Sequence, residues 1–180
     1  IVQKTRHRHA IMRLYVCRGM TPNNQEKMMK TEVAKCAAEI RKYLKAKGVK
    51  ASVRSENYSM GDSVRVNIKE IIDPAVLNEI KLETSKYQYG HFDGMQDLYE
   101  NSNVNPNIPQ TKFLFVQYDW KVEDAFIEAV IPVLKTKVEF DDRDADFEYK
   151  RLARGVLHGS DWASFCSFDD LKDSAQGEAA

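Results

Sequence analysis

The sequence predicts an α+β domain in which a small antiparallel or mixed sheet, built from a hairpin and one central strand, packs with two or more helices. Apolar residues recur at helical spacing between Thr31 and Lys47. Apolar and polar residues alternate at 49–54 and 64–69, and a continuous apolar run follows at 111–118. With 43% hydrophobic residues among 180, the chain can bury a core of its own.

The segment from Thr31 to Lys47 is the clearest expected helix. Its apolar face consists of Val33, Cys36, Ala37, Ile40 and Leu44. Cations crowd the last turn, where the helix dipole favours them. Gly48 follows at the position where many helices end in a left-handed residue. We therefore expect this helix to end at Gly48 and to bury Cys36 as a small core residue.

The two alternating segments predict a pair of half-buried strands. The intervening stretch from Ser55 to Asp62 is rich in turn-forming residues and is expected to form the hairpin loop. Arg54 and Arg65 fall on the outer face of this hairpin. Exposed cations on outer strands commonly serve solubility and edge protection, and contact with a ligand is the alternative.

A second helix is expected to begin at Asp73 and Pro74 and to run to about Thr84, because Asp caps free N–H groups and Pro suits a first turn. Residues 101–110 contain four Asn and two Pro and predict a loop. The run at 111–118 is apolar on both faces, which is typical of a central strand.

The remainder of the chain is expected to be mainly helical. Helical spacing recurs from Val122 to Val133, and Pro132 is expected to bend or end that helix. A short strand at 135–140 and a helix at 144–157 should follow. An aromatic cluster docked on the body is expected from Trp162, Phe165 and Phe168.

The predicted organisation has four regions. Residues 1–20 form a basic extension or derive from a vector, and a strand at 10–17 or contact with nucleic acid is the alternative. An α+β core domain spans 21–135, an acidic helical extension spans 136–172, and a disordered tail spans 173–180.

The stretch from Tyr87 to Glu100 concentrates four aromatics, one histidine, three acids and two glycines. Gly90 and Gly94 predict sharp turns on both sides of a tripeptide centred on Phe92. A chain that turns twice around a phenylalanine commonly holds that side chain in a core. We therefore expect Phe92 to be buried.

The net charge of zero conceals an asymmetry. Residues 1–54 hold fourteen Lys and Arg against three Asp and Glu, which gives +11, whereas residues 55–180 hold thirteen against twenty-four, which gives −11. This asymmetry favours a polyanion on one side and a basic partner, or mimicry of DNA, on the other. The simpler interpretation is that the two halves neutralise each other within one compact body.

Sequence chemistry argues against catalysis, metals and other cofactors. The cysteines, odd in number and far apart, indicate a reducing compartment such as the cytoplasm; they are Cys17, Cys36 and Cys166. No apolar run is long enough to cross a membrane.

Two local groups of polar residues have the residue types of catalytic or metal sites. The tightest group of potential ligands is His91, Asp93, Asp97 and Glu100. Its spacing is nonspecific, so no metal site is expected. A triad-like group is formed by His158, Ser160 and Asp161. Triads converge from separate parts of a fold, so local proximity counts against this one, and we expect no enzyme.

One motif carries a family resemblance. Residues 87–99 read Tyr-x-Tyr-Gly-x-Phe-Asp-Gly-Met-x-Asp-x-Tyr and follow a helix, a hairpin and a capped helix. This arrangement resembles the twenty-ninth of the large polyvalent protein-associated domains of phages and conjugative elements. The matching residues lie at 37–44, 53–55, 61–66 and 89–95, with Asp97 and Tyr99, within the span 31–118.

The resemblance implies a mobile-element protein. Such domains occur in long polyvalent chains delivered with incoming DNA, whose proposed role is to protect that DNA from host defence. The resemblance implies no catalytic residue. Because this chain carries the domain with an acidic C-terminal third of its own, we expect a stand-alone inhibitor of the anti-CRISPR or anti-restriction type, acting by binding in the cytoplasm of the bacterial host.

The expected partner is a host defence protein or ribonucleoprotein complex. An acidic segment of this chain would contact the basic channel of that partner through charge complementarity. That segment contains Glu139, Asp141, Asp142, Asp144, Asp146 and Glu148. The alternative is that these acids form only a solvated helix face.

A nucleic-acid-binding module is the alternative function. Cations of the first helix and the hairpin would contact phosphates, and one tyrosine would stack on a base. These residues are Lys35, Arg41, Lys42, Lys45, Lys47, Arg54, Arg65 and Tyr58. The zero net charge counts against this alternative.

Overall fold

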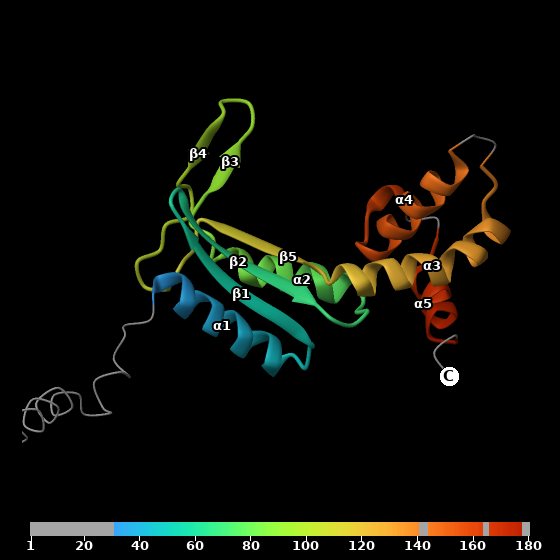
Figure 1. Cartoon of the computed structure of the whole chain (residues 1–180), viewed down its shortest axis with the longest axis horizontal. Coiled ribbons are helices and arrows are strands. Elements are labelled where there is room, and N and C mark those ends of the chain that lie inside the picture. The colour runs from blue at the N-terminus through green and yellow to red at the C-terminus, as the bar shows by residue number, and fades with distance from the viewer. Residues whose placement is uncertain (1–30, 141–143, 164–165, 178–180) are drawn as a thin grey trace, which may run out of the picture. The chain divides into compact units, whose positions relative to one another are not determined.

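The computed structural model describes residues 31–140, 144–163 and 166–177, and contacts place the described residues from Glu32 onward in one compact unit. Figure 1 shows helices combined with a three-stranded sheet and a separate two-stranded hairpin. The α+β class is therefore confirmed. The finer division into four regions stays a prediction.

The three-stranded sheet has the order β1-β2-β5. β1 (Ala51–Tyr58) pairs antiparallel with β2 (Gly61–Ile68), and β2 pairs parallel with β5 (Phe113–Tyr118). The expected central strand at 111–118 is therefore wrong, because β5 lies at an edge and β2 is central. β5 is apolar on both faces because its inner residues meet the core while aromatic residues occupy its outer face.

The expected hairpin loop from Ser55 to Asp62 is also wrong. The β1–β2 ladder continues to the Tyr58 and Gly61 pair, so only two residues remain in the turn. Asp62, expected in the loop, lies in β2. Its carboxylate accepts hydrogen bonds from the Thr111 hydroxyl at 2.9 Å and from the Lys112 N–H at 2.6 Å, and it thereby fixes the start of β5.

The two N-terminal helices agree with the sequence expectation. α1 (Glu32–Ala46) packs on β1 and β2 through the predicted apolar face, including the fully buried Cys36, and Gly48 beyond its end has a φ of +76°. α2 (Pro74–Ser85) begins with the predicted cap, because the Asp73 carboxylate accepts the Ala75 N–H at 2.7 Å. Both predicted helix ends are confirmed.

α3 (Trp120–Lys137) runs through Pro132, so the helix does not end at this proline, and the expected strand at 135–140 is wrong. A proline inside a helix removes one backbone hydrogen bond. The apolar face of α3 continues past it, and Val130 and Leu134 on either side are fully buried. Burial of this face outweighs the missing bond.

Two further helices and a short 3₁₀ turn complete the chain. The helix predicted at 144–157 is confirmed as α4 (Ala145–Leu157), and the 3₁₀ turn η2 (Asp161–Ala163) leads towards α5 (Phe168–Gly177). α5 overlaps the first residues of the tail predicted at 173–180, and 178–180 lie outside the described residues.

The predicted docking of the C-terminal aromatic residues is confirmed at Phe168 and in part at Trp162, whose ring lies against Gly155 of α4. The Phe168 ring stacks on Phe126 of α3, with 6.2 Å between centroids. Trp162 is half exposed, with 49% of its surface accessible, and Phe165 lies outside the described residues.

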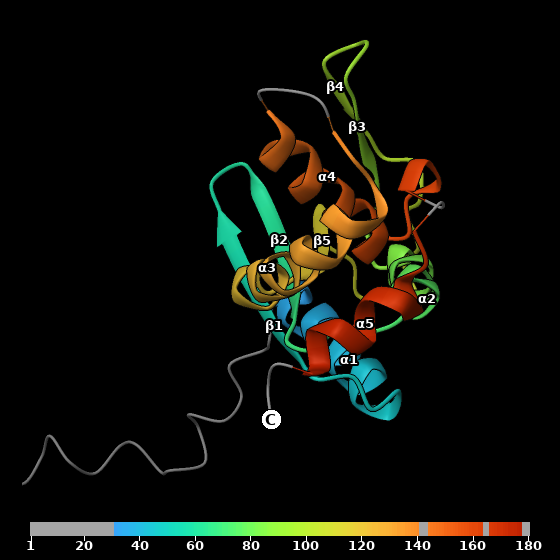
Figure 2. The ribbon, with the colours of Figure 1, turned by 90° about the vertical axis from the view of Figure 1, so that its right-hand side faces the viewer.

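The stretch from 87 to 100 forms a small hairpin of β3 (His91–Asp93) and β4 (Leu98–Glu100), which extends away from the three-stranded sheet in Figures 1 and 2. The expected burial of Phe92 is wrong, because 56% of its surface is exposed. Tyr99 anchors the hairpin instead, and its hydroxyl donates a hydrogen bond to the Lys112 carbonyl.

No described helix is long and apolar enough to span a membrane.

Candidate nucleic-acid interface

The outer face of the three-stranded sheet is the candidate site. Side chains alternate between the two faces of a strand, and α1 covers the face that carries Val53 and Val66. The other face therefore carries the intervening residues. Directly across the three strands lie Arg54, Arg65 and Phe115, one from each strand, and all three are exposed.

The centre of this face is an arginine over an exposed aromatic ring. The Arg65 guanidinium carbon lies 5.4 Å from the centroid of Phe115, within cation–π range, and 43% of the Phe115 surface is accessible. Phe113 lies beside it, with its ring nearly parallel at 12° and 6.4 Å away. Exposed aromatic rings next to cations are the kind of surface on which unpaired bases stack.

The rings continue from the sheet towards the hairpin, and we call this set the aromatic row: Tyr89, Tyr99, Phe113 and Phe115. Tyr99 meets Phe113 edge-on at 5.4 Å. The Lys112 ammonium lies 5.0 Å from the Tyr99 centroid and 5.5 Å from that of Phe113. Burial raises the pKa of Tyr89 and of Tyr99.

Two arginines stand side by side on this face. Arg54 and Arg65 are direct cross-strand partners, an arrangement in which like charges repel. The Glu56 carboxylate lies 4.0 Å from the Arg65 Nε, and both side chains are about half exposed, so it relieves little of the repulsion. Tyr58, at the end of β1, is 46% exposed. An anion bound between the arginines would remove this repulsion.

The structure divides the predicted nucleic-acid residues into two groups. Arg54, Arg65 and Tyr58 lie on the outer face, whereas the lysines of the first helix and Arg41 lie on α1 or just beyond it, on the opposite side of the sheet. Two of these lysines have acidic partners: Lys35 pairs with Glu32, and Lys47 pairs with Glu79. Lys42 and Lys45 are exposed on α1.

The acidic segment is partly neutralised by its own surroundings. The Asp146 carboxylate pairs with Lys135 at 3.2 Å, and Glu148 pairs with Arg151 at 2.9 Å. Glu139 and Asp144 are exposed. The other two predicted contacts, Asp141 and Asp142, lie outside the described residues.

The histidine and acids of the 87–100 stretch take part in hairpin structure. The His91 ring lies 3.0 Å from the Ser102 hydroxyl and 3.7 Å from the Glu100 carboxylate. The Asp93 carboxylate accepts the Met95 N–H at 2.8 Å in the turn, where Asp97 has a φ of 53°. Among the described residues, no group of three or more potential ligands could hold a metal ion.

The triad-like group lies at the end of α4. The His158 ring packs edge-on against Tyr118 with centroids 5.6 Å apart, and burial lowers its pKa below the ordinary value. The Ser160 N–H donates to the Gly155 carbonyl at 2.8 Å and closes the end of the helix.

Comparison with family models matches residues 31–125 to large polyvalent protein associated domain 29. This match covers more than half of the chain. The chain belongs to this family. The resemblance seen in the sequence is therefore confirmed, and the family is associated with polyvalent proteins of phages and mobile elements. Comparisons with curated proteins and with solved structures gave no match.

The family domain contains the whole candidate site. Its span runs from α1 to the first turns of α3 and includes all five strands and the aromatic row. α4 and α5 lie beyond it. Sequence reasoning missed Lys112, Phe113 and Phe115 as members of the site. The available signal was the spacing of the two phenylalanines, which places them on one face of a strand whose other face fills the core.

Proposed function

We propose that this domain binds single-stranded nucleic acid on the outer face of its three-stranded sheet. The observation that carries the proposal is that two adjacent cations lie next to an exposed ring on neighbouring strands. These residues are Arg54, Arg65 and Phe115. Bases would stack on the aromatic row, and phosphates would lie between the arginines.

Single strands suit this face better than duplexes. Stacking on a protein ring requires an unpaired base, and each such contact contributes about 1–3 kcal/mol. A duplex hides the faces of its bases and would meet only the cations. The zero net charge of the chain counts against a site that depends on charge alone, so stacking must supply part of the affinity.

A fluorescein-labelled oligothymidylate tests this proposal by fluorescence anisotropy. We expect saturable binding that weakens steeply with salt. Phe115→Ala should weaken it by about tenfold, because one stacking contact is lost. Arg54→Glu with Arg65→Glu should weaken it by about a hundredfold and reduce the salt dependence.

Lys42→Glu is the matched control, because this exposed lysine lies on α1, on the other side of the sheet. It is expected to change the affinity by less than about threefold, as a distant surface charge does under screening salt. Equal losses from Lys42→Glu and Arg65→Glu would show that binding follows overall charge and would remove the outer face from the proposal.

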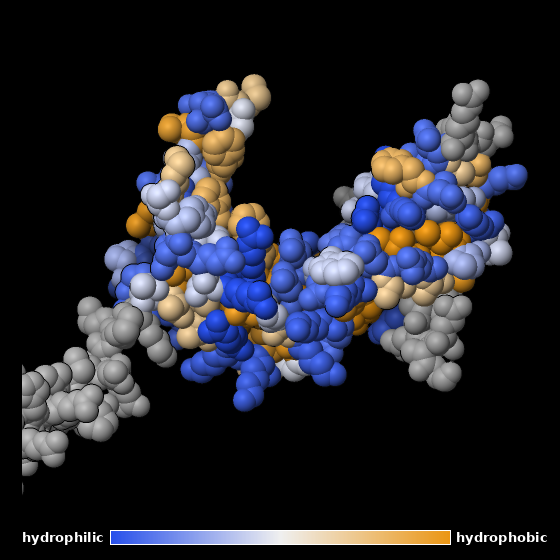
Figure 3. Space-filling view, in the orientation of Figure 1, coloured by the Kyte–Doolittle hydropathy of each residue, from blue (hydrophilic) through white to orange (hydrophobic). Residues whose placement is uncertain are grey.

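A second candidate function is inhibition of a host defence protein or ribonucleoprotein complex by direct, non-enzymatic contact in the bacterial cytoplasm, of the anti-CRISPR or anti-restriction type. Exposed apolar residues on the β3–β4 hairpin favour a protein contact: Phe92, Met95 and Leu98 expose 56%, 95% and 56% of their surfaces. Figure 3 shows hydrophobic side chains along this hairpin. Such residues commonly provide the centre of a protein interface.

DNA cleavage by a purified CRISPR effector complex and by a restriction endonuclease tests the second candidate. We expect the full chain to slow cleavage by one of them, and Met95→Asp at the hairpin tip to abolish the effect. Gln96→Asp adds the same charge at an exposed polar neighbour and should preserve most of it. Unimpeded cleavage by both enzymes at saturating protein would contradict this function for these two classes of defence.

A further inference from the structure

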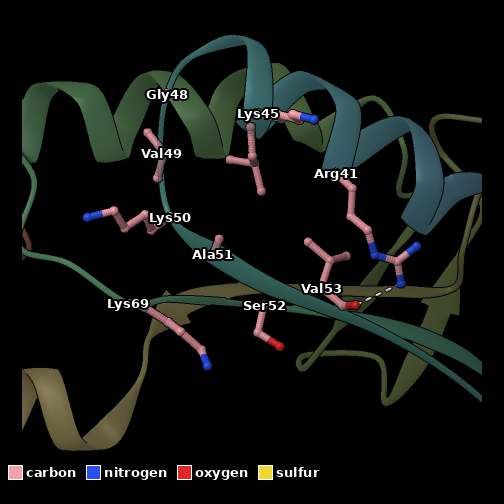
Figure 4. A pocket seen from close by; sticks show the side chains of 10 residues that line it. Arg41, Lys45, Gly48, Val49, Lys50, Ala51, Ser52, Val53 and Lys69 are labelled. Carbon is pink, nitrogen blue, oxygen red and sulfur yellow. Dashed lines mark hydrogen bonds between the residues drawn. The ribbon is translucent and has the colours of Figure 1, made fainter.

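A groove of about 700 Å³ lies between α1 and the edge strand β1. Figure 4 shows Arg41 reaching from the helix towards the Val53 carbonyl and β1 running along the groove, and Lys45 of the helix also lines it. Its apolar lining consists of Leu44, Val49, Ala51 and Val53. Its cations are Arg41, Lys45, Lys50 and Lys69, and none of the described lining residues is acidic.

The backbone of β1 is available in this groove. The Lys69 N–H donates to the Lys50 carbonyl at 2.8 Å, so this pair belongs to the hydrogen-bonded rungs that join the two strands. Because rungs alternate in an antiparallel ladder, the peptide groups of Ala51 and Val53 point away from β2. The Arg41 side chain agrees with this direction, since it donates to the Val53 carbonyl at 2.8 Å.

We propose that this groove binds an extended acidic peptide, which adds to the free edge of β1 as a further strand. Its backbone would pair with Ala51 and with the Val53 N–H. Alternate side chains would rest on the apolar lining on the α1 side, where Lys45 lies at the edge of the groove. The intervening acids would point to the other face of the strand and would meet Lys50 and Lys69. Bonding to Val53 O already fixes Arg41 beside the path of the peptide.

The lysines at the edge of the groove, which we call its rim, are available to bind a partner. Lys45 and Lys69 are exposed, and neither has an ion pair among the described residues. Lys50 has only a loose contact with Glu70 at 3.6 Å, and 81% of its side chain is accessible. Adding an acidic strand therefore breaks no strong internal pair.

Two other occupants fit this groove less well. A nucleic-acid strand would use the cations but would leave the apolar lining and the outward peptide groups without partners. The chain's own residues 1–30 carry seven Lys and Arg against one Glu, so the basic rim would repel them. An acidic peptide matches the apolar lining, the strand edge and the charge together.

The test uses the full chain and a short fluorescein-labelled peptide that alternates glutamate and valine. Fluorescence anisotropy should show saturable binding, and Lys45→Glu with Lys69→Glu should weaken it at least about tenfold. Two versions of the peptide, N-methylated on one or the other set of alternate residues, separate strand pairing from charge. Only the version that is methylated on the residues whose N–H groups face β1 should lose binding.

Several outcomes distinguish this site from the outer face. Arg65→Glu should leave peptide binding unchanged, and oligothymidylate should not displace the peptide. The proposal is overturned if the peptide does not bind at low salt, or if both N-methylated versions bind as well as the parent. It is also overturned if Lys45→Glu with Lys69→Glu weakens oligothymidylate binding instead, which would identify the groove as a phosphate site. Removal of residues 1–30 should not strengthen peptide binding, and a large gain would identify those residues as the native occupant.

Discussion

Gly90→Ala is expected to destabilise the protein by about 3 kcal/mol. A Cβ added at Gly90 would overlap the Glu100 carbonyl oxygen and would lie 2.7 Å from the Tyr99 ring and 2.9 Å from the Glu100 carbonyl carbon. Two of these neighbours are backbone atoms, so the β3–β4 hairpin itself must move to admit a methyl group. Urea unfolding followed by circular dichroism measures the loss.

The same substitution should also weaken nucleic-acid binding. Tyr99 donates to the Lys112 carbonyl and meets Phe113 edge-on, so displacement of the hairpin backbone is transmitted to the aromatic row. We expect oligothymidylate affinity to fall together with stability. Intact affinity in a destabilised Gly90→Ala protein would show that the hairpin does not support the outer face.

Gly94→Ala provides the matched control in the same motif. An added Cβ at Gly94 has no atom within 4 Å, and its φ lies outside the left-handed region. The expected change in unfolding free energy is within about 0.5 kcal/mol. If the two substitutions cost the same, helix and strand propensity and not close backbone contact would explain the effect at Gly90.

The sequence predicts the helices well where local residues define their ends. The Asp73 cap and Gly48 act within a few positions of the helix they bound, so their chemistry can be read locally. The place of a strand in a sheet depends instead on partners far along the chain. β5 joins β2 about fifty positions away, and its apolar run fits an edge with exposed rings as well as a buried centre.

The candidate site was predicted only in part for the same reason. Arg54 and Arg65 alternate outward on adjacent strands of one hairpin, so a short stretch of sequence places them together. Phe115 joins them only through the parallel register of β5. Conversely, the cations of α1 are close to Arg54 in sequence but lie across the sheet from it, because the helix covers the opposite face.

Phe126→Ala is expected to cost about 3–5 kcal/mol of unfolding free energy, the largest effect among these substitutions. Only 2% of the Phe126 surface is accessible, and its ring stacks on Phe168 between α3 and α5. Truncation removes this contact and leaves a cavity between helices that cannot close without moving both. For a chain of this length, the midpoint of thermal unfolding should fall by roughly 10 °C.

Phe147→Ala is the control, because this phenylalanine of α4 exposes 62% of its surface and should cost less than about 0.5 kcal/mol. The shape of the Phe126→Ala transition also tests cooperativity. The Asp119 N–H donates to the Ile68 carbonyl at 2.7 Å, so α3 begins directly on the end of β2, and one buried core contains residues of the sheet and of α3, α4 and α5. Because the damage at Phe126 is then shared by the whole core, we expect a single transition at lower temperature. Two transitions, of which only the second removes the β-sheet signal, would show that the C-terminal helices unfold independently of the family domain.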